Sequence, residues 1–130
     1  MTRTREKVKG RSSCRRFLAL PHAVLEHQDF VSLSNKAVRL LLDLAMQYNG
    51  SNNGDLCATF SMMKKRGWSS NDQRSKALKE LIDKNFIVLT RQGGRKIASL
   101  HAITWQPINE CGGKLDVSST KLAPRSFREK

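Results

Sequence analysis

The chain has 130 residues, of which 38% are apolar and 27% charged, so it is long enough for one compact domain and short for two. No apolar run approaches the roughly 18 residues that cross a bilayer, and no apolar stretch follows the charged N-terminus, which argues against a secretory signal. The 24 lysines and arginines exceed the 11 acidic residues by 13, which favours a polyanionic partner, usually a nucleic acid and sometimes an anionic membrane.

Residues 1–16 are predicted to form a flexible basic arm, because they carry seven bases and one acid and lack apolar periodicity. Such an arm is either a solvated tail or a segment that contacts DNA. Order is expected to begin near Phe17. A short helix from His22 to Gln28 follows, with Val24 and Leu25 as its buried contacts.

The segment from Asn35 to Tyr48 predicts a helix, since apolar residues recur there at steps of three and four. Ser34 is its expected N-cap, and the Asn49–Gly50 pair is expected to end it. Additional apolar residues make the segment hydrophobic over more than one face, so we expect it to be the central helix of the core.

A short strand is expected at residues 55–57, then a helix from Phe60 to Arg66 and a turn at residues 67–70. The next predicted helix runs from Asn71 to Lys84, with Ser70 as its N-cap and Asn85 in a left-handed conformation after its end. One face of this helix is apolar. The opposite face carries Asp72, Lys76, Lys79 and Asp83.

Residues 86–91 and 98–105 are rich in β-branched and aromatic side chains, which predicts two strands. The glycines between them predict a hairpin with a basic tip. Pro107 ends the pattern, and residues 107–130 are expected to form an extended tail. Trp68 and Trp105 are expected to fill the core, and His101 to be an ordinary strand side chain.

This order of elements predicts an α+β fold, a winged helix-turn-helix domain over residues 17–106. The physical basis is the B-form major groove, which is about 12 Å wide and accepts one α-helix. In this arrangement the preceding helix braces the inserted one, and the hairpin reaches the neighbouring DNA backbone.

The segment SSNDQRSKALKELIDKNFIVLTRQGGRK resembles the recognition helix and wing of many bacterial winged-helix regulators. Those regulators read roughly Ser-x-x-Thr-x-x-x-Ala-Leu-x-x-Leu-x-x-x-Gly-Leu-Ile. Gln73 stands here in place of the usual Thr, Asn85 in place of the usual Gly, and Arg74 at a usually apolar position. Asn85 still tolerates a positive φ, so the turn is preserved.

A longer resemblance covers about residues 17–117, through stretches such as FLALPHAVL, LTRQGGRKIASLHAITW and ECGGKLDV. These are similar to small helix-turn-helix proteins of phages, plasmids and integrated mobile elements, which look related to the DNA-binding domains of replication initiators. The resemblance implies a DNA-binding role on a mobile element.

The candidate DNA-binding residues lie on the two adjacent helices, their turn and the hairpin: Lys64, Lys65, Arg66, Ser69, Ser70, Asn71, Gln73, Arg74, Lys76, Lys79, Arg91, Arg95 and Lys96. The lysines of the second helix either contact DNA or only solvate its surface. Amides such as Asn71 and Gln73 pair with adenine edges, although Asn71 is equally suited to helix capping. The cations near the end of the first helix also have a simple explanation in the helix dipole.

No catalytic motif is visible, and the acidic residues are too scattered for a nuclease metal cluster, so an enzyme is not expected. Three cysteines without CxxC spacing predict neither a disulfide framework nor a zinc site, and they fit a reducing compartment. No cofactor or metal is expected.

The expected function is sequence-specific binding of double-stranded DNA by a cytoplasmic bacterial protein, as a transcriptional regulator of a mobile element. Two alternatives remain open: a replication-initiation protein, and a winged-helix module that binds a host protein. A homodimer is possible, and no membrane partner is expected.

Overall fold

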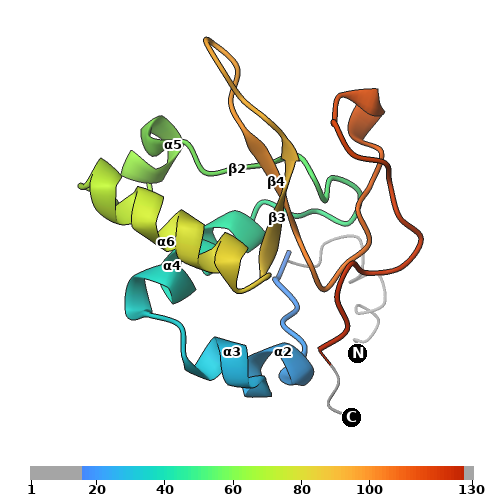
Figure 1. Cartoon of the computed structure of the whole chain (residues 1–130), viewed down its shortest axis with the longest axis horizontal. Helices are drawn as coiled ribbons and strands as arrows, with labels where there is room; N and C mark the ends of the chain where they lie inside the picture. Colours follow the sequence, from blue (N-terminus) through green and yellow to red (C-terminus); the bar gives the residue numbers. More distant parts are fainter. Residues whose placement is uncertain (1–15, 128–130) are drawn as a thin grey trace, which may run out of the picture.

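The computed structural model describes residues 16–127, so the predicted basic arm lies outside the described residues except for Arg16. The described residues form a mixed α+β fold, which confirms the predicted class (Figure 1). None of its helices is long and apolar enough to cross a membrane. The helices are α2 (His22–Glu26), α3 (Gln28–Val31), α4 (Asn35–Ala45), α5 (Phe60–Lys64), α6 (Asn71–Asp83) and the 3-10 turn η1 (Cys111–Gly113), and the strands are β2 (Leu56–Cys57), β3 (Ile87–Arg91) and β4 (Leu100–Ile103).

The first predicted helix is interrupted where one continuous helix was expected. His27 has an extended backbone, with φ −66° and ψ 142°, so α2 ends before it and α3 begins after it. Its Nδ1 accepts a hydrogen bond from the backbone N–H of Asp29 at 3.0 Å. The side chain thereby caps α3, a role that the apolar pattern did not reveal.

The other helix predictions are confirmed, with ends one to three residues earlier than expected. The Ser34 hydroxyl caps α4 by accepting from the N–H of Ala37, and the Ser70 hydroxyl caps α6 by accepting from the N–H of Gln73. Asn85 has φ 62° after the end of α6, as expected. Because short polar side chains satisfy the free N–H groups of a first turn, the starts of these helices are readable from sequence.

The sheet has three antiparallel strands in the order β2–β4–β3, so the last strand lies between the other two. All four residues of β4 are buried, while in β3 Ile87 and Thr90 are buried and the other three residues are more exposed. Beyond the regular strands, the hairpin continues to a bridge between Gly94 and Ile97. A Cβ at Gly93 would lie 2.4 Å from the backbone nitrogen of Ser99, so the close approach of the two arms requires glycine there.

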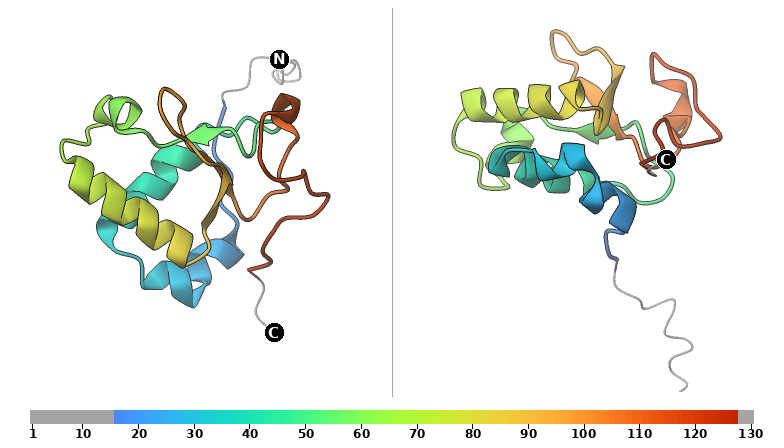
Figure 2. Two further views of the ribbon diagram at one scale, coloured as in Figure 1. Left: turned by 45° about the horizontal axis from the view of Figure 1, so that its top comes forward. Right: turned by 60° about the horizontal axis from the view of Figure 1, so that its bottom comes forward.

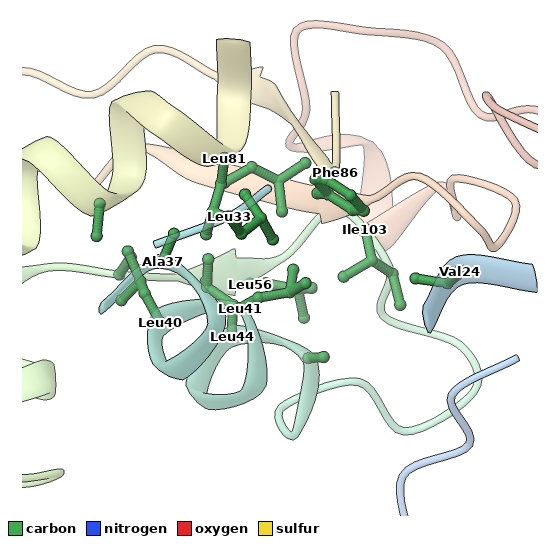
Figure 3. Packing of buried hydrophobic residues seen from close by; sticks show 14 of the residues in the cluster. Val24, Leu33, Ala37, Leu40, Leu41, Leu44, Leu56, Leu81, Phe86 and Ile103 are labelled. Atoms are coloured by element: carbon green, nitrogen blue, oxygen red, sulfur yellow. The ribbon is translucent and has the colours of Figure 1, made fainter. Parts of the chain in front are cut away.

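The core lies between α4, α6 and the sheet, where α4 packs against both α6 and β2. Figure 3 shows Leu40, Leu41 and Leu44 of α4 facing the side chains that come from α6 and the strands. Leu42 of α4 and Met46 at its C-cap are 40% and 46% exposed, so not every apolar residue of this segment is buried in the core.

Residues 107–127, predicted as an extended tail, contain little regular structure but pack back on the domain. Phe127 is 6% exposed and its ring stacks on that of Phe86, with centroids 5.5 Å apart. Arg125 donates to Asp29 Oδ2 at 2.6 Å and to the carbonyl of Lys84 at 2.7 Å. The C-terminal loops lie across the sheet from α5 and α6 (Figure 2). The packed unit therefore continues past residue 106.

Replacing Phe127 with alanine tests whether this segment is part of the domain. Removing a buried phenylalanine leaves a cavity, so Phe127→Ala is expected to lower the free energy of unfolding by about 3 kcal/mol, measured by urea denaturation. Leu122→Ala is the matched control because Leu122 is 80% exposed, and it is expected to change stability by less than about 0.5 kcal/mol. Equal stabilities of the two variants would contradict the packing.

Candidate nucleic-acid interface

A groove of about 460 Å³ separates the N-terminal half of α6 from the hairpin. Asn71, Arg74 and Leu78 line it from α6, and residues 93, 94 and 97–99 line it from the hairpin. Phe60 of α5 and His101 of β4 also line it. Helix α6 and the hairpin, which the sequence analysis assigned to one DNA-binding surface, therefore flank a common groove.

Arg74 lies in this groove as a half-buried cation. Its Nη1 donates to the carbonyl of Ala58 at 2.8 Å, and its Nε and Nη2 donate to Asn71 Oδ1 at 3.0 and 2.8 Å. Burial lowers the pKa of Arg74, but the guanidinium stays charged near neutral pH. Within residues 16–127 no carboxylate forms an ion pair with it. The groove thus contains a positive charge held by neutral acceptors.

His101 is 3% exposed, and its Nδ1 has no hydrogen-bond partner among the described residues. Burial, and then the positive charge of Arg74, lower its pKa to about 4. The imidazole is therefore neutral at physiological pH. The sequence predicted an ordinary strand side chain, and nothing in its strand pattern indicated the neighbouring cation.

The outer face of α6 is exposed and electrically balanced. Lys76 Nζ lies 3.2 Å from Asp72 Oδ2, and Lys79 Nζ lies 3.3 Å from Asp83 Oδ2. Both pairs have the i,i+4 spacing of neighbours on a helix surface. Gln73 is exposed beside this face, whereas the side-chain oxygen of Asn71 is occupied by Arg74.

The predicted basic residues of the first helix lie just before the turn to α6. Lys64 places its Nζ 5.5 Å from the ring centroid of Phe60, and Lys65 is exposed. Arg66 follows the end of α5 and donates from Nε to Asp43 Oδ1 at 3.2 Å. Arg66 is thereby directed towards α4 and away from the groove beside the hairpin.

Two of the three predicted hairpin cations are free to contact a ligand. Arg95 and Lys96 are exposed at the tip, where Lys96 has φ 65°. Arg91 instead donates from Nη2 to the carbonyl of Ala98 at 2.9 Å, across the base of the hairpin, and its Nε is buried without a described partner. Arg91 therefore braces the hairpin.

Sequence reasoning missed two cations on α4. Lys36 Nζ lies 5.8 Å and Arg39 Cζ 5.9 Å from the centroid of the Trp68 ring, which belongs to the turn between α5 and α6. Trp68 is buried, as expected, and its Nε1 donates to Asp43 Oδ2 at 2.8 Å. The spacing of Lys36, Arg39 and Asp43 by three and four residues was the available signal, since it places them on one helix face.

Four of the candidate residues therefore lie in two hollows on either side of α6. Asn71 and Arg74 face the groove beside the hairpin, while Ser69 and Gln73 line a hollow together with Lys36 and Arg39. Ser70 caps the helix between them.

No family model matches the chain, and no curated protein or solved structure is significantly similar to it. Among residues 16–127, no group of three or more histidine, cysteine or acidic side chains is arranged to hold a metal ion.

The environment of His101 makes stability depend on pH. In the unfolded chain the imidazole takes up a proton near pH 6.5, whereas in the folded chain it does so only near pH 4. Stability is therefore lost as the pH falls from 6.5 towards 4, by about 3 kcal/mol for this group. NMR titration of the His101 imidazole is expected to give a midpoint near 4.

The variant His101→Gln removes the titrating group and is expected to lose less stability than the wild type over the same pH range, measured by urea denaturation. An imidazole midpoint near 6.5, or the same pH dependence of stability in the wild type and the variant, would show that folding does not disfavour the charged form of His101.

Proposed function

We propose that residues 16–127 form a winged helix-turn-helix domain that binds double-stranded DNA. The order α4–β2–α5–α6–β3–β4 and the sheet order β2–β4–β3 support this, because they place a helix pair and a hairpin on one compact core. The turn between α5 and α6 is tight, with Gly67 at φ 97°. The hairpin projects beyond the body of the molecule near α5 (Figure 1).

The observation that carries the proposal is the half-buried guanidinium of Arg74, which no carboxylate of residues 16–127 pairs with, in the groove between α6 and a hairpin with a basic tip. A buried charge is costly unless a counter-charge or strong hydrogen bonds offset it. The acceptors of Arg74 in the described part of the chain are neutral, so an anion close to the groove is favoured electrostatically. A nucleic acid backbone passing between α6 and the hairpin would supply phosphates.

In this proposal α6 enters the major groove with its exposed face towards the bases. Gln73 is the best placed amide for reading a base edge, since Asn71 is held by Arg74. Lys76 and Lys79 have to exchange Asp72 and Asp83 for phosphates, which costs little because exposed ion pairs contribute about 0.3–0.5 kcal/mol each. Contacts with the DNA phosphates fix the position of the protein along the duplex, and four exposed cations make them: Lys64, Lys65, Arg95 and Lys96.

The biological role proposed for this binding is transcriptional control on a mobile element. Its support is the resemblance of the sequence to small helix-turn-helix proteins of such elements. Replication initiation is the alternative within the same DNA-binding function. A footprint on its own promoter supports control of transcription, and a footprint confined to an origin supports initiation.

Gel-shift and fluorescence-anisotropy measurements test the proposal directly. The duplex is selected from a random pool by binding to the wild type. Arg95→Glu is expected to weaken binding at least tenfold, because it replaces a phosphate-binding cation with a repelling charge. Lys121→Glu makes the same change of charge in the C-terminal loops, which lie across the sheet from α5 and α6, and is expected to have a much smaller effect.

If the wild type binds no duplex, or prefers structured RNA at equal salt, the proposed function is wrong. If the wild type binds neither duplex nor structured RNA, a protein partner becomes the better explanation of the exposed surfaces. If the Arg95 and Lys121 variants weaken binding equally, only the excess charge matters and the assigned surface is wrong.

The salt dependence of binding is a further expected result. If the protein neutralises about six phosphates, the affinity is expected to fall by roughly a thousandfold between 50 and 200 mM salt, because bound counterions are released. Anisotropy titrations across this range measure the slope. A slope near zero would contradict backbone contacts.

A further inference from the structure

A second positively charged surface lies on the other side of α6, around the turn that joins it to α5. A hollow of about 40 Å³ there is lined by Lys36 and Arg39 of α4, by Gly67, Trp68 and Ser69 of the turn, and by Gln73 of α6. This volume accommodates a water molecule or a phosphate oxygen. We call these residues, together with Arg66, the turn cluster.

Cations outnumber acidic groups in the turn cluster. Against its three cations, Lys36, Arg39 and Arg66, the described residues set one paired carboxylate, that of Asp43, which lies beside the two arginines. Asp43 is 5% exposed and already accepts from Trp68 Nε1 and Arg66 Nε. The side chains of Arg39 and Arg66 remain 55% and 49% exposed. Since the single carboxylate is buried and its oxygens are occupied, the surface retains a positive excess.

Among the described residues, no acidic group of the adjacent helix lines the hollow, and two of them are directed to other partners. Asp72 pairs with Lys76 along the outer face of α6. Glu80 accepts from both the backbone N–H and the hydroxyl of Ser34, at 2.8 and 2.7 Å.

Helix geometry places the turn cluster and the hairpin groove on opposite flanks of α6. At 100° per residue, Gln73 and Glu80 fall on the flank that faces α4, and Asn71 and Leu78 fall on the flank that faces the hairpin. The exposed face with Lys76 and Lys79 lies between them. A helix about 10–12 Å in diameter that fills a major groove has one DNA strand on each side, so each flank would meet its own line of phosphates.

We propose that the turn cluster binds a backbone phosphate of the DNA strand opposite to the one that the hairpin contacts. The inference rests on the proposed function and adds a second strand contact that includes the core helix α4. Lys36 and Arg39 supply the charge, while the Ser69 hydroxyl lines the same hollow and can donate a hydrogen bond to a phosphate oxygen. Such a contact positions the protein without reading sequence.

Lys36→Ala is the main test, because Lys36 is exposed and its one described side-chain contact is with the Trp68 ring. Anisotropy titrations use the selected duplex and an unrelated duplex of equal length over a range of salt. The variant is expected to bind both duplexes about fivefold more weakly at 0.15 M salt, with the slope of log affinity against log salt reduced by about 0.9. Lys36→Glu is expected to have a larger effect.

Lys121→Ala is the control for the loss of one exposed lysine, and it is expected to leave the slope nearly unchanged. An unchanged thermal midpoint and circular dichroism spectrum for Lys36→Ala are expected, so that the effect belongs to binding and not to folding.

If the wild type binds duplex and Lys36→Ala matches it in affinity and slope, this inference is wrong and the proposed function stands. If Lys36→Ala weakens binding to the selected duplex alone, Lys36 reads bases and the phosphate assignment is wrong. If the wild type binds no duplex, both the proposed function and this inference fail.

Discussion

The position of α6 depends on the buried carboxylate of Asp43. It accepts hydrogen bonds from Trp68 Nε1 and Arg66 Nε, and Arg39 Nε lies 3.9 Å away. A carboxylate in the core is costly unless such donors satisfy it, so the turn between α5 and α6 is held against α4. Gly67 in this turn has φ 97°, a conformation that residues with a Cβ rarely adopt. The same contacts bring the cations of α4 to the start of α6.

The distribution of charge around α6 follows from this arrangement. Its outer face pairs its own lysines with its own aspartates, so the excess positive charge lies on the two flanks, in the hairpin groove and in the turn cluster. In the proposed complex with DNA, these cationic flanks would face the two lines of phosphates and supply affinity, and the balanced outer face would supply selectivity.

The C-terminal loops and the hairpin groove depend on contacts that are far apart in sequence. Phe127 fills a place beside Phe86 and Trp105, and Arg125 joins the loops to α3 and to the end of α6. An isolated phenylalanine in a polar stretch has no periodicity, so an extended tail was the natural prediction. Arg74 and His101 likewise come from different elements, and the low pKa of His101 arises from burial and proximity that only folding creates.

The amino-acid sequence by itself determined the local structure: the α+β class, the extents of α4 and α6 within a few residues, their serine caps, the left-handed Asn85 and the hairpin. These features depend on periodicity, capping and turn chemistry, which act between near neighbours. Tertiary structure alone decided the packing of Phe127, the contact of Arg125 with Asp29 and the gathering of Lys36 and Arg39 around Trp68. Each of these depends on residues that meet only when the chain closes on its core, and no local pattern records such distances.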